Sequence, residues 1–212
     1  MSKFEPLYTA FSMHTKPKHV SSCECCVNDD EIKVLLSKKL KDISAEEISH
    51  YASSVFLTVG SKQDYLYFFP RILELCLTEQ FDWPDPEVVF NSILRAEFEL
   101  WNSNQRDLVR ALAKNKFVTL LKTDEDGSEI EQWLCAIARI EPELSDYLAL
   151  LENTDNIKAL KNFTEWNSDC ASSKRLANRF WDECPEQEQQ VLAWLRQGKS
   201  AEYLFEMYGM RM

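Results

Sequence analysis

The sequence predicts an all-α protein. Glycine is scarce, with four residues among 212, and no segment shows the strict alternation of apolar and polar residues that marks a half-buried strand. Apolar residues instead recur three and four positions apart, behind residues that cap helices. These observations favour an irregular stack of about ten helices. Because short connections favour antiparallel neighbours, we expect a helical-hairpin array of the HEAT kind.

The first 28 residues lack sustained periodicity and contain Pro6 and Pro17, so we expect residues 1–28 to form an irregular N-terminal arm. Helix signals begin at Asn28, whose short polar side chain can cap the residues that follow. A chain of this length can bury a sizeable core without disulfides or metal. We therefore expect residues 29–212 to form one all-α domain.

Two capping signals predict the next helices. Ser44 and Glu47 have the spacing of a capping box, in which each side chain satisfies the other's backbone N–H group. The helix that they begin is expected to end at Gly60. Residues 61–64 repeat the start signal more weakly. Within that second helix, Pro70 lacks a backbone donor and predicts a kink or a short break.

Turn and boundary signals divide the remaining chain. Pro86 suits the first turn of a helix, residues 102–104 provide a break and a cap, Asp126–Gly127 is a turn signal, and Pro142 marks a boundary. Apolar stripes at helical spacing predict helices within residues 88–98, 108–121, 130–138, 144–151, 157–166, 176–181, 191–195 and 203–207.

Negative charge is concentrated in one segment. The chain has 24 basic and 35 acidic residues, a net charge of −11, and residues 124–155 hold ten acidic residues against one base, Arg139. Such a field repels nucleic acid and anionic lipid and speeds encounter with a basic protein. The segment has two interpretations, a solvated acidic loop or a docking surface for a basic partner. We therefore expect a protein partner and no nucleic acid or membrane partner.

The docking interpretation names specific residues. Carboxylates in and after the acidic loop would pair with lysine or arginine on the partner, and a neighbouring aromatic side chain would anchor the contact. At helical spacing such an aromatic residue also suits the core. The expected partner-binding residues are Asp124, Glu125, Asp126, Glu129, Glu131 and Trp133.

No apolar run approaches the roughly 18 residues that span a bilayer. The first residues, Met1–Pro6, lack the apolar core of a signal peptide. We expect a soluble, cytoplasmic protein. Because thiols stay reduced in that compartment, the seven cysteines are expected to be free thiols or metal ligands.

The stretch HVSSCECC raises the question of a metal site. Cys23 and Cys26 have the spacing that lets two thiolates bind one tetrahedral zinc ion, and His19 or His14 could add a nitrogen ligand. A complete site would need a second pair of ligands, and the other cysteines are scattered singly. Ordinary reduced cysteines are favoured and we expect no cofactor. The alternative is a zinc-binding protein that uses His19, Cys23, Cys25 and Cys26.

The sequence lacks the combinations that nucleophilic or phosphoryl-transfer chemistry requires. Gly-rich phosphate loops are absent, and His50 has no serine or cysteine nucleophile motif to activate. The acidic loop leaves too few ligands before Gly127 for a calcium-binding pattern. We expect a protein that is not an enzyme, with a helical hydrolase that uses dispersed carboxylates as a third possibility.

Residues 40–52, 58–60 and 64–75, which include the run Phe68-Phe69-Pro70-Arg71-Ile72-Leu73-Glu74-Leu75, resemble a family of small bacterial all-helical proteins. Members carry an upstream Cys-x-x-Cys, a Leu-x-x-Leu-x-x-x-Asp-Leu-x-x-Tyr helix, a Gly-bounded turn and a Phe-Leu-Pro-Arg-x-Leu-Glu-Leu segment. The resemblance covers residues 19–77. This chain has Phe69 where the family has leucine, and Cys25 is additional. The family implies an all-α fold and no particular activity.

In size, acidity and helicity the chain is also similar to the all-α immunity proteins of bacterial contact-dependent growth inhibition systems. This likeness implies a non-enzymatic protein that neutralises a toxin domain by covering the toxin's basic active site with acidic surface. A nuclease is the natural toxin, because its active site needs a basic groove for phosphate and an acidic protein can imitate that phosphate.

Overall fold

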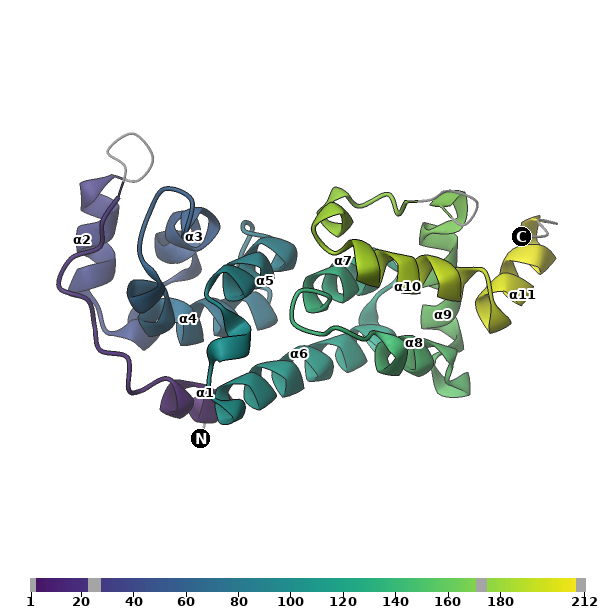
Figure 1. Cartoon of the computed structure of the whole chain (residues 1–212), viewed down its shortest axis with the longest axis horizontal. Helices are drawn as coiled ribbons and strands as arrows, with labels where there is room; N and C mark the ends of the chain where they lie inside the picture. The colour runs from purple at the N-terminus through teal and green to yellow at the C-terminus, as the bar shows by residue number, and fades with distance from the viewer. Residues whose placement is uncertain (1–2, 23–27, 171–174, 209–212) are drawn as a thin grey trace. The chain divides into compact units, whose positions relative to one another are not determined.

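The computed structural model describes residues 3–22, 28–170 and 175–208. Across these ranges the chain forms eleven α-helices and five short 3-10 helices, and no β-strand (Figure 1). The predicted all-α class, with about ten helices, is confirmed. Within the same ranges, no helix combines the length and the apolar character needed to cross a bilayer.

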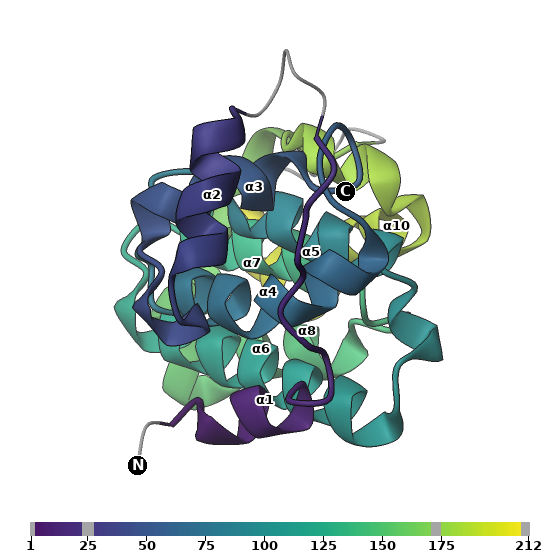
Figure 2. The same ribbon diagram turned by 90° about the vertical axis from the view of Figure 1, so that its left-hand side faces the viewer.

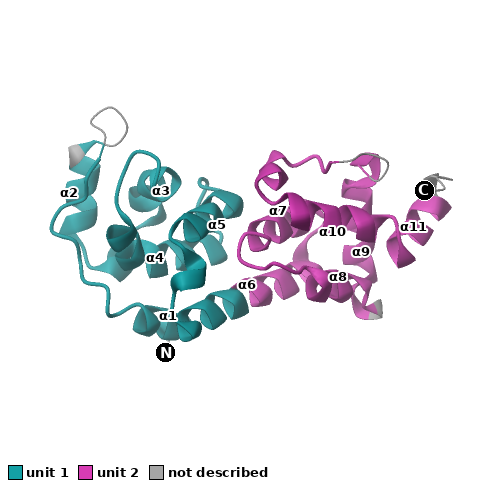
Figure 3. Cartoon of the chain, viewed as in Figure 1, with its two compact units in different colours: residues 1–112 teal, residues 113–212 magenta. Residues whose placement is uncertain are grey.

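The chain divides into two compact units, residues 1–112 and residues 113–212 (Figure 3). The boundary falls inside a helix, whereas the sequence analysis expected one domain from residue 29 onward. The first unit holds α1 (Glu5–Ala10), α2 (Asp29–Ser37), α3 (Ala45–Ser54), α4 (Lys62–Leu77), α5 (Pro86–Arg95) and the beginning of α6 (Ser103–Thr123). The second holds the remainder of α6, α7 (Ser128–Ile137), α8 (Ser145–Glu152), α9 (Ile157–Trp166), α10 (Pro185–Leu195) and α11 (Gly198–Tyr208).

The N-terminal arm is more ordered than the sequence analysis expected. Residues 5–10 form α1, and Leu7 and Phe11 are buried. The Phe11 ring lies 4.9 Å from the ring of Phe69 and 5.3 Å from that of Trp101, measured between centroids. After α1 the chain is extended (Figure 2), and the Ser21 carbonyl accepts a hydrogen bond from the Gly60 N–H group at 2.8 Å. Aromatic packing thus fixes a segment whose two prolines suggested irregular structure.

Helix α4 is the centre of the first unit. It contacts α1, α3 and α5, and eleven of its sixteen residues are buried. The predicted capping pair at Ser61 and Asp64 is present at its start. The helix continues through Pro70, so the short break is wrong, and the alternative expectation of a kink stays a prediction. Buried residues on both sides of Pro70 hold the helix together despite the hydrogen bond that proline cannot make.

The predicted capping box of Ser44 and Glu47 begins α3, as expected. The helix ends at Ser54, however, before Gly60. Gly60 has a φ of +72° and serves the turn that follows; a Cβ there would lie 2.9 Å from the Tyr51 hydroxyl. The glycine is therefore required by a turn and a close contact, not by the end of the helix.

The segment that resembles the bacterial family contains an ion pair that joins three parts of the first unit. The Arg71 guanidinium donates to the Glu74 carboxylate at 2.9 Å and to the main-chain carbonyl of Ile43 at 2.8 Å. Glu74 in turn accepts a hydrogen bond from the hydroxyl of Tyr8 in α1. Burial, followed by the nearby Glu74 carboxylate, raises the pKa of Tyr8. The Pro-Arg-x-Leu-Glu segment therefore connects α1, α4 and Ile43, which follows the 3-10 helix at residues 40–42.

In the second unit, α9 contacts α7, α8 and α11, and α10 contacts α8 and α11. The helix expected at residues 176–181 is wrong in position and type, since residues 179–183 form a 3-10 helix instead. Asn178 caps its first turn by accepting from the Phe180 N–H group at 3.0 Å. That turn buries Trp181 completely.

Replacing Tyr8 with phenylalanine tests the tie between α1 and α4. The change removes one hydrogen bond to a carboxylate, so we expect Tyr8→Phe to lower the free energy of unfolding by about 1–2 kcal/mol. The matched control is Tyr67→Phe in α4, where the half-buried hydroxyl has no protein partner among the described residues; we expect a change below about 0.5 kcal/mol. Urea denaturation of both variants makes the comparison, and equal losses would contradict the assignment.

Candidate functional site

The acidic loop between α6 and α7 is organised by Asp124, which is buried. Its carboxylate accepts from the Gly127 N–H group at 3.0 Å and from the Ile130 N–H group at 2.9 Å. Ile130 is in the first turn of α7, so Asp124 caps this helix and places negative charge at its positive end. Asp124 was expected to bind a partner, but its carboxylate is committed to the backbone.

The same loop packs closely against α9. The Asn162 side-chain amide donates to the main-chain carbonyl of Glu125 at 2.7 Å. Gly127 has a φ of +87°, and a Cβ there would come within 2.5 Å of the Asn162 backbone. The predicted Asp126–Gly127 turn is therefore present, and only glycine allows the loop to approach α9 so closely.

Glu131 and Trp133, two further expected partner-binding residues, also lie inside the unit; 3% and 2% of their surfaces are exposed. The Glu131 carboxylate accepts from the Trp181 indole N–H at 2.5 Å and from the Asn178 amide at 3.1 Å. Burial raises the pKa of Glu131 above its usual range, although both hydrogen bonds act in the opposite direction. A partner cannot reach these two side chains in this fold.

The three remaining expected residues, Glu125, Asp126 and Glu129, are exposed. Ser128 donates to the Asp126 carboxylate from both its hydroxyl, at 2.5 Å, and its N–H group, at 2.9 Å. These bonds lower the pKa of Asp126. The loop therefore presents a carboxylate that stays ionised, beside Glu125 and Glu129.

Arg139, the single base between residues 124 and 155, points inward. Its side chain is completely buried, and its guanidinium donates to the main-chain carbonyls of Cys135 at 2.7 Å and Phe180 at 3.0 Å. It also pairs with Glu183 at 3.0 Å. Eight of the segment's ten acidic side chains are at least partly exposed: Glu125, Asp126, Glu129, Glu141, Glu143, Asp146, Glu152 and Asp155.

A groove lies between α8 and α10 and has a volume of about 490 Å³. Its walls include Glu143 and Glu152 from the acidic segment, and its apolar lining includes Leu148, Ala149 and Trp194. We call it the α8–α10 groove. It is lined by Glu143, Ser145, Leu148, Ala149, Glu152, Gln190, Ala193, Trp194, Gln197 and Gly198.

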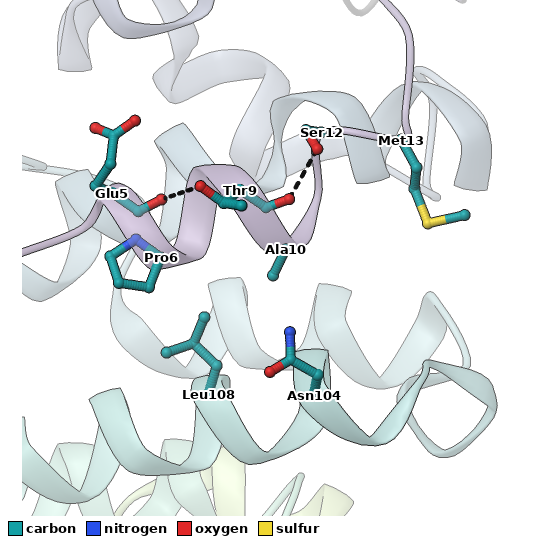
Figure 4. Close-up of a pocket in the computed structure, with 8 residues that line it drawn as sticks. All are labelled: Glu5, Pro6, Thr9, Ala10, Ser12, Met13, Asn104 and Leu108. Carbon is teal, nitrogen blue, oxygen red and sulfur yellow. Dashed lines mark hydrogen bonds between the residues drawn. The ribbon is translucent and has the colours of Figure 1, made fainter.

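A second hollow, of about 590 Å³, lies between α1 and the beginning of α6 in the first unit (Figure 4). Figure 4 shows Asn104 and Leu108 of α6 across from Pro6 and Ala10 of α1. Among the described residues that line it, Glu5 is the one ionisable residue, and it pairs with Lys41 at 2.7 Å. Within that part of the chain, the hollow offers no pair of groups for acid–base chemistry.

The cysteine cluster is only partly described. His19 is exposed, and Cys23, Cys25 and Cys26 lie outside the described residues. Within the described ranges, no three histidine, cysteine, aspartate or glutamate side chains lie close enough to hold a metal ion. The alternative zinc site at residues 19–26 stays a prediction.

His50 pairs with Glu31 at 2.9 Å, and both side chains are about half exposed. The four described cysteines, Cys76, Cys135, Cys170 and Cys184, are buried. Burial raises the pKa of the Cys170 and Cys184 thiols, which disfavours the reactive thiolate. These groups therefore act as packing and hydrogen-bonding residues.

Sequence reasoning missed the residues that shape the groove. Gln190 and Trp194 lie four positions apart on one face of α10, and the sequence analysis interpreted Trp194 simply as part of an apolar stripe. Their separation by four positions does indicate that the two side chains lie on the same face of a helix. The partner helix, α8, could not be identified without the tertiary structure.

Comparison with known proteins gave no match to a protein-family model, to a curated protein sequence or to a solved structure. The resemblance to the bacterial all-helical family and the likeness to immunity proteins therefore stay predictions.

Asp124→Ala tests the internal role of that carboxylate. The substitution leaves the N–H groups of Gly127 and Ile130 without their acceptor, so we expect a loss of about 2–3 kcal/mol in the free energy of unfolding. Glu125→Ala, one position along the same loop, serves as the control and should change it by less than about 0.5 kcal/mol. Chemical denaturation followed by circular dichroism measures both, and a neutral Asp124→Ala variant would contradict the capping role.

Glu131→Gln tests the raised pKa. The usual pKa of 4.5 is raised in the folded state, so above about pH 4.5 the folded chain retains a proton that the unfolded chain has lost. Glu131 therefore makes its full contribution to the free energy of unfolding below that pH, and this contribution decreases as pH rises through the pKa of the folded state. Glutamine cannot ionise, so the free energy of unfolding of Glu131→Gln has no such pH dependence. The difference in free energy of unfolding between the wild type and the variant should therefore decrease between pH 4.5 and 7. Urea denaturation across this range measures the difference, and a deficit that does not vary with pH contradicts the assignment.

Proposed function

We propose that this chain is a non-enzymatic protein-binding protein whose partner is basic. Its most concrete form is a bacterial, cytoplasmic immunity protein that covers the basic active site of a toxin domain. The observation that carries the proposal is the orientation of charge between residues 124 and 155. The segment's one base is buried, while eight of its acidic side chains reach the surface.

This orientation makes the surface more acidic than the sequence count suggests. Arg139 is buried and its ion pair is with Glu183, which lies outside the segment, so this base is not displayed beside the segment's exposed carboxylates. Bases from other segments compensate partly, as in the Lys114–Asp146 pair at 3.6 Å. Residues 113–212 still hold 18 acidic residues against 12 basic ones.

The exposed carboxylates at the start of α7 are the part most suited to a basic partner. Glu125, Asp126 and Glu129 lie within five consecutive positions, on a loop held by Asp124 and Asn162. Because the loop is fixed by internal hydrogen bonds, little conformational entropy would be lost when a partner binds. Fixed negative charge speeds association with a basic surface and contributes to specificity.

A nuclease toxin fits this chemistry. A nuclease must present lysine and arginine side chains to the phosphates of its substrate. An ordered row of carboxylates can occupy such a site in place of phosphate. The two buried carboxylates of the segment, Asp124 and Glu131, bind the backbone and Trp181 and do not contribute to this surface.

The test uses the gene immediately upstream of this one. If the proposal is correct, that gene encodes a protein whose C-terminal domain is toxic when expressed alone, and co-expression of this chain restores growth and forms a complex. Glu125→Lys combined with Glu129→Lys should weaken the complex at least tenfold at low salt, about 1.4 kcal/mol. It should also reduce the dependence of affinity on salt.

The control is Glu46→Lys combined with Asp107→Lys. Both residues are exposed acids of the first unit, so this variant has the same net charge. It should bind as the wild type does, and circular dichroism should show that both double variants fold. An upstream domain that is not toxic, or is toxic but not neutralised, argues against the immunity function; equal affinity of the two variants argues against the acidic loop as the contact.

A further inference from the structure

The α8–α10 groove is formed by matching faces of two helices. Its lining residues on α8 are Ser145, Leu148, Ala149 and Glu152, and those on α10 are Gln190, Ala193 and Trp194, with Gln197 just after the end of α10. The α8 set follows the spacing i, i+3, i+4, i+7 and the α10 set the spacing i, i+3, i+4, which places each set on one face of its helix. The small side chains of Ala149 and Ala193 in the middle of each face leave the hollow between the helices.

Hydrogen bonds hold the two helices in place at both ends of the groove. Near the beginning of α8, Gln190 accepts from the Leu144 N–H group at 2.8 Å and donates to the Pro142 carbonyl at 2.9 Å. Near the end of α8, Lys199, in the first turn of α11 directly after α10, donates to the Glu152 main-chain carbonyl at 2.6 Å. The groove is therefore formed before any partner arrives, and α8 and α10 run side by side in the same direction.

The groove combines an apolar middle with acidic ends. Glu143 lies before the first turn of α8 and Glu152 in its last turn, so roughly 10 Å or more of helix separates them. Between them lie Leu148 and the rings and methyl groups of Trp194 and Ala193. Lys199, the base that reaches this end, donates to the main chain of Glu152, which leaves the Glu152 carboxylate for a ligand.

We propose that the α8–α10 groove receives an amphipathic helix of the basic partner, with lysine or arginine at two positions seven residues apart and apolar side chains at the third and fourth positions between them. The two bases would face Glu143 and Glu152, and the apolar pair would fill the space above Ala149 and Ala193. Seven residues of helix span about 10.5 Å, which is the length of α8 from Ser145 to Glu152, and Glu143 lies two positions before that helix. Helices that dock in grooves use this pattern of anchors. The inference rests on the proposed function for the basic character of the partner.

The probe is a synthetic helical peptide of about fifteen residues, long enough to form a helix on binding. It carries two lysines seven residues apart and two leucines between them; a second peptide has glutamine in place of both lysines. Indole ¹H–¹⁵N resonances report on binding, and Trp194→Phe identifies the Trp194 resonance among those of the six tryptophans. Trp194 lines the groove, and its Nε1 atom has no acceptor among the described residues, so a ligand that packs against the ring should shift the indole resonance.

We expect the lysine peptide to shift the Trp194 resonance in a saturable manner and the glutamine peptide to bind at least tenfold more weakly. Ala193→Arg should weaken the lysine peptide at least tenfold, because it adds both bulk and positive charge to the groove. Ala111→Arg is the matched control, since Ala111 is an exposed alanine on α6 with the same change of charge; it should stay within twofold of the wild type.

Equal binding by Ala193→Arg and Ala111→Arg overturns the inference, and so does peptide binding that leaves the Trp194 resonance in place. A Trp194 shift that depends on protein concentration without peptide assigns the groove to a second copy of this chain and also overturns the inference.

If Glu125→Lys with Glu129→Lys abolishes binding to the natural partner while Ala193→Arg does not, the proposed function stands and only the groove's occupant is wrong. If the peptide binds as expected but the upstream domain is not neutralised, the groove inference stands and the immunity function falls.

Discussion

In the second unit, the Asp124 carboxylate supplies the cap that Gly127, at the N-terminal boundary of α7, has no side chain to provide. Much of the acidic surface depends on this capping by a residue outside the helix. Because residue 127 is a glycine, the loop can approach the α9 backbone. Because α7 starts at this point, Glu131 and Trp133 fall at buried positions of the helix and Glu129 at an exposed one. One buried carboxylate therefore helps to decide which of its acidic neighbours can meet a partner.

The first unit depends on a comparable interaction between distant segments. Arg71 and Glu74 are one helical turn apart on α4, and they bind the main chain of Ile43 and the hydroxyl of Tyr8. Both charges are mostly buried and each is compensated by the other, which limits the cost of removing them from water. This gives the family-like segment a physical reason to contain Pro-Arg-x-Leu-Glu that is independent of any catalytic activity.

The proposals for the acidic loop and the α8–α10 groove share one electrostatic basis. Arg139 lies in the interior, where it joins α7 to the 3-10 helix at residues 179–183, and eight of the ten acids of the same segment are at least partly exposed. The loop residues supply charge without an apolar contact, which favours fast association. The groove adds Leu148 and Trp194 between two carboxylates, and tryptophan is among the residue types that carry most of the binding energy in protein interfaces.

The sequence by itself determined the all-α class and the starts of several helices, because capping pairs such as Ser44 and Glu47 act over four residues. It also located the acidic segment. Tertiary structure decided the path of the first arm, the role of Gly60 and the continuity of the helix through Pro70. It also decided which acidic side chains are buried and which are exposed. Glu131 accepts a hydrogen bond from Trp181, fifty positions away, and helical spacing does not show which distant side chain will cover a carboxylate. Local patterns therefore predicted the helices, and long-range packing selected which charged residues remain available for function.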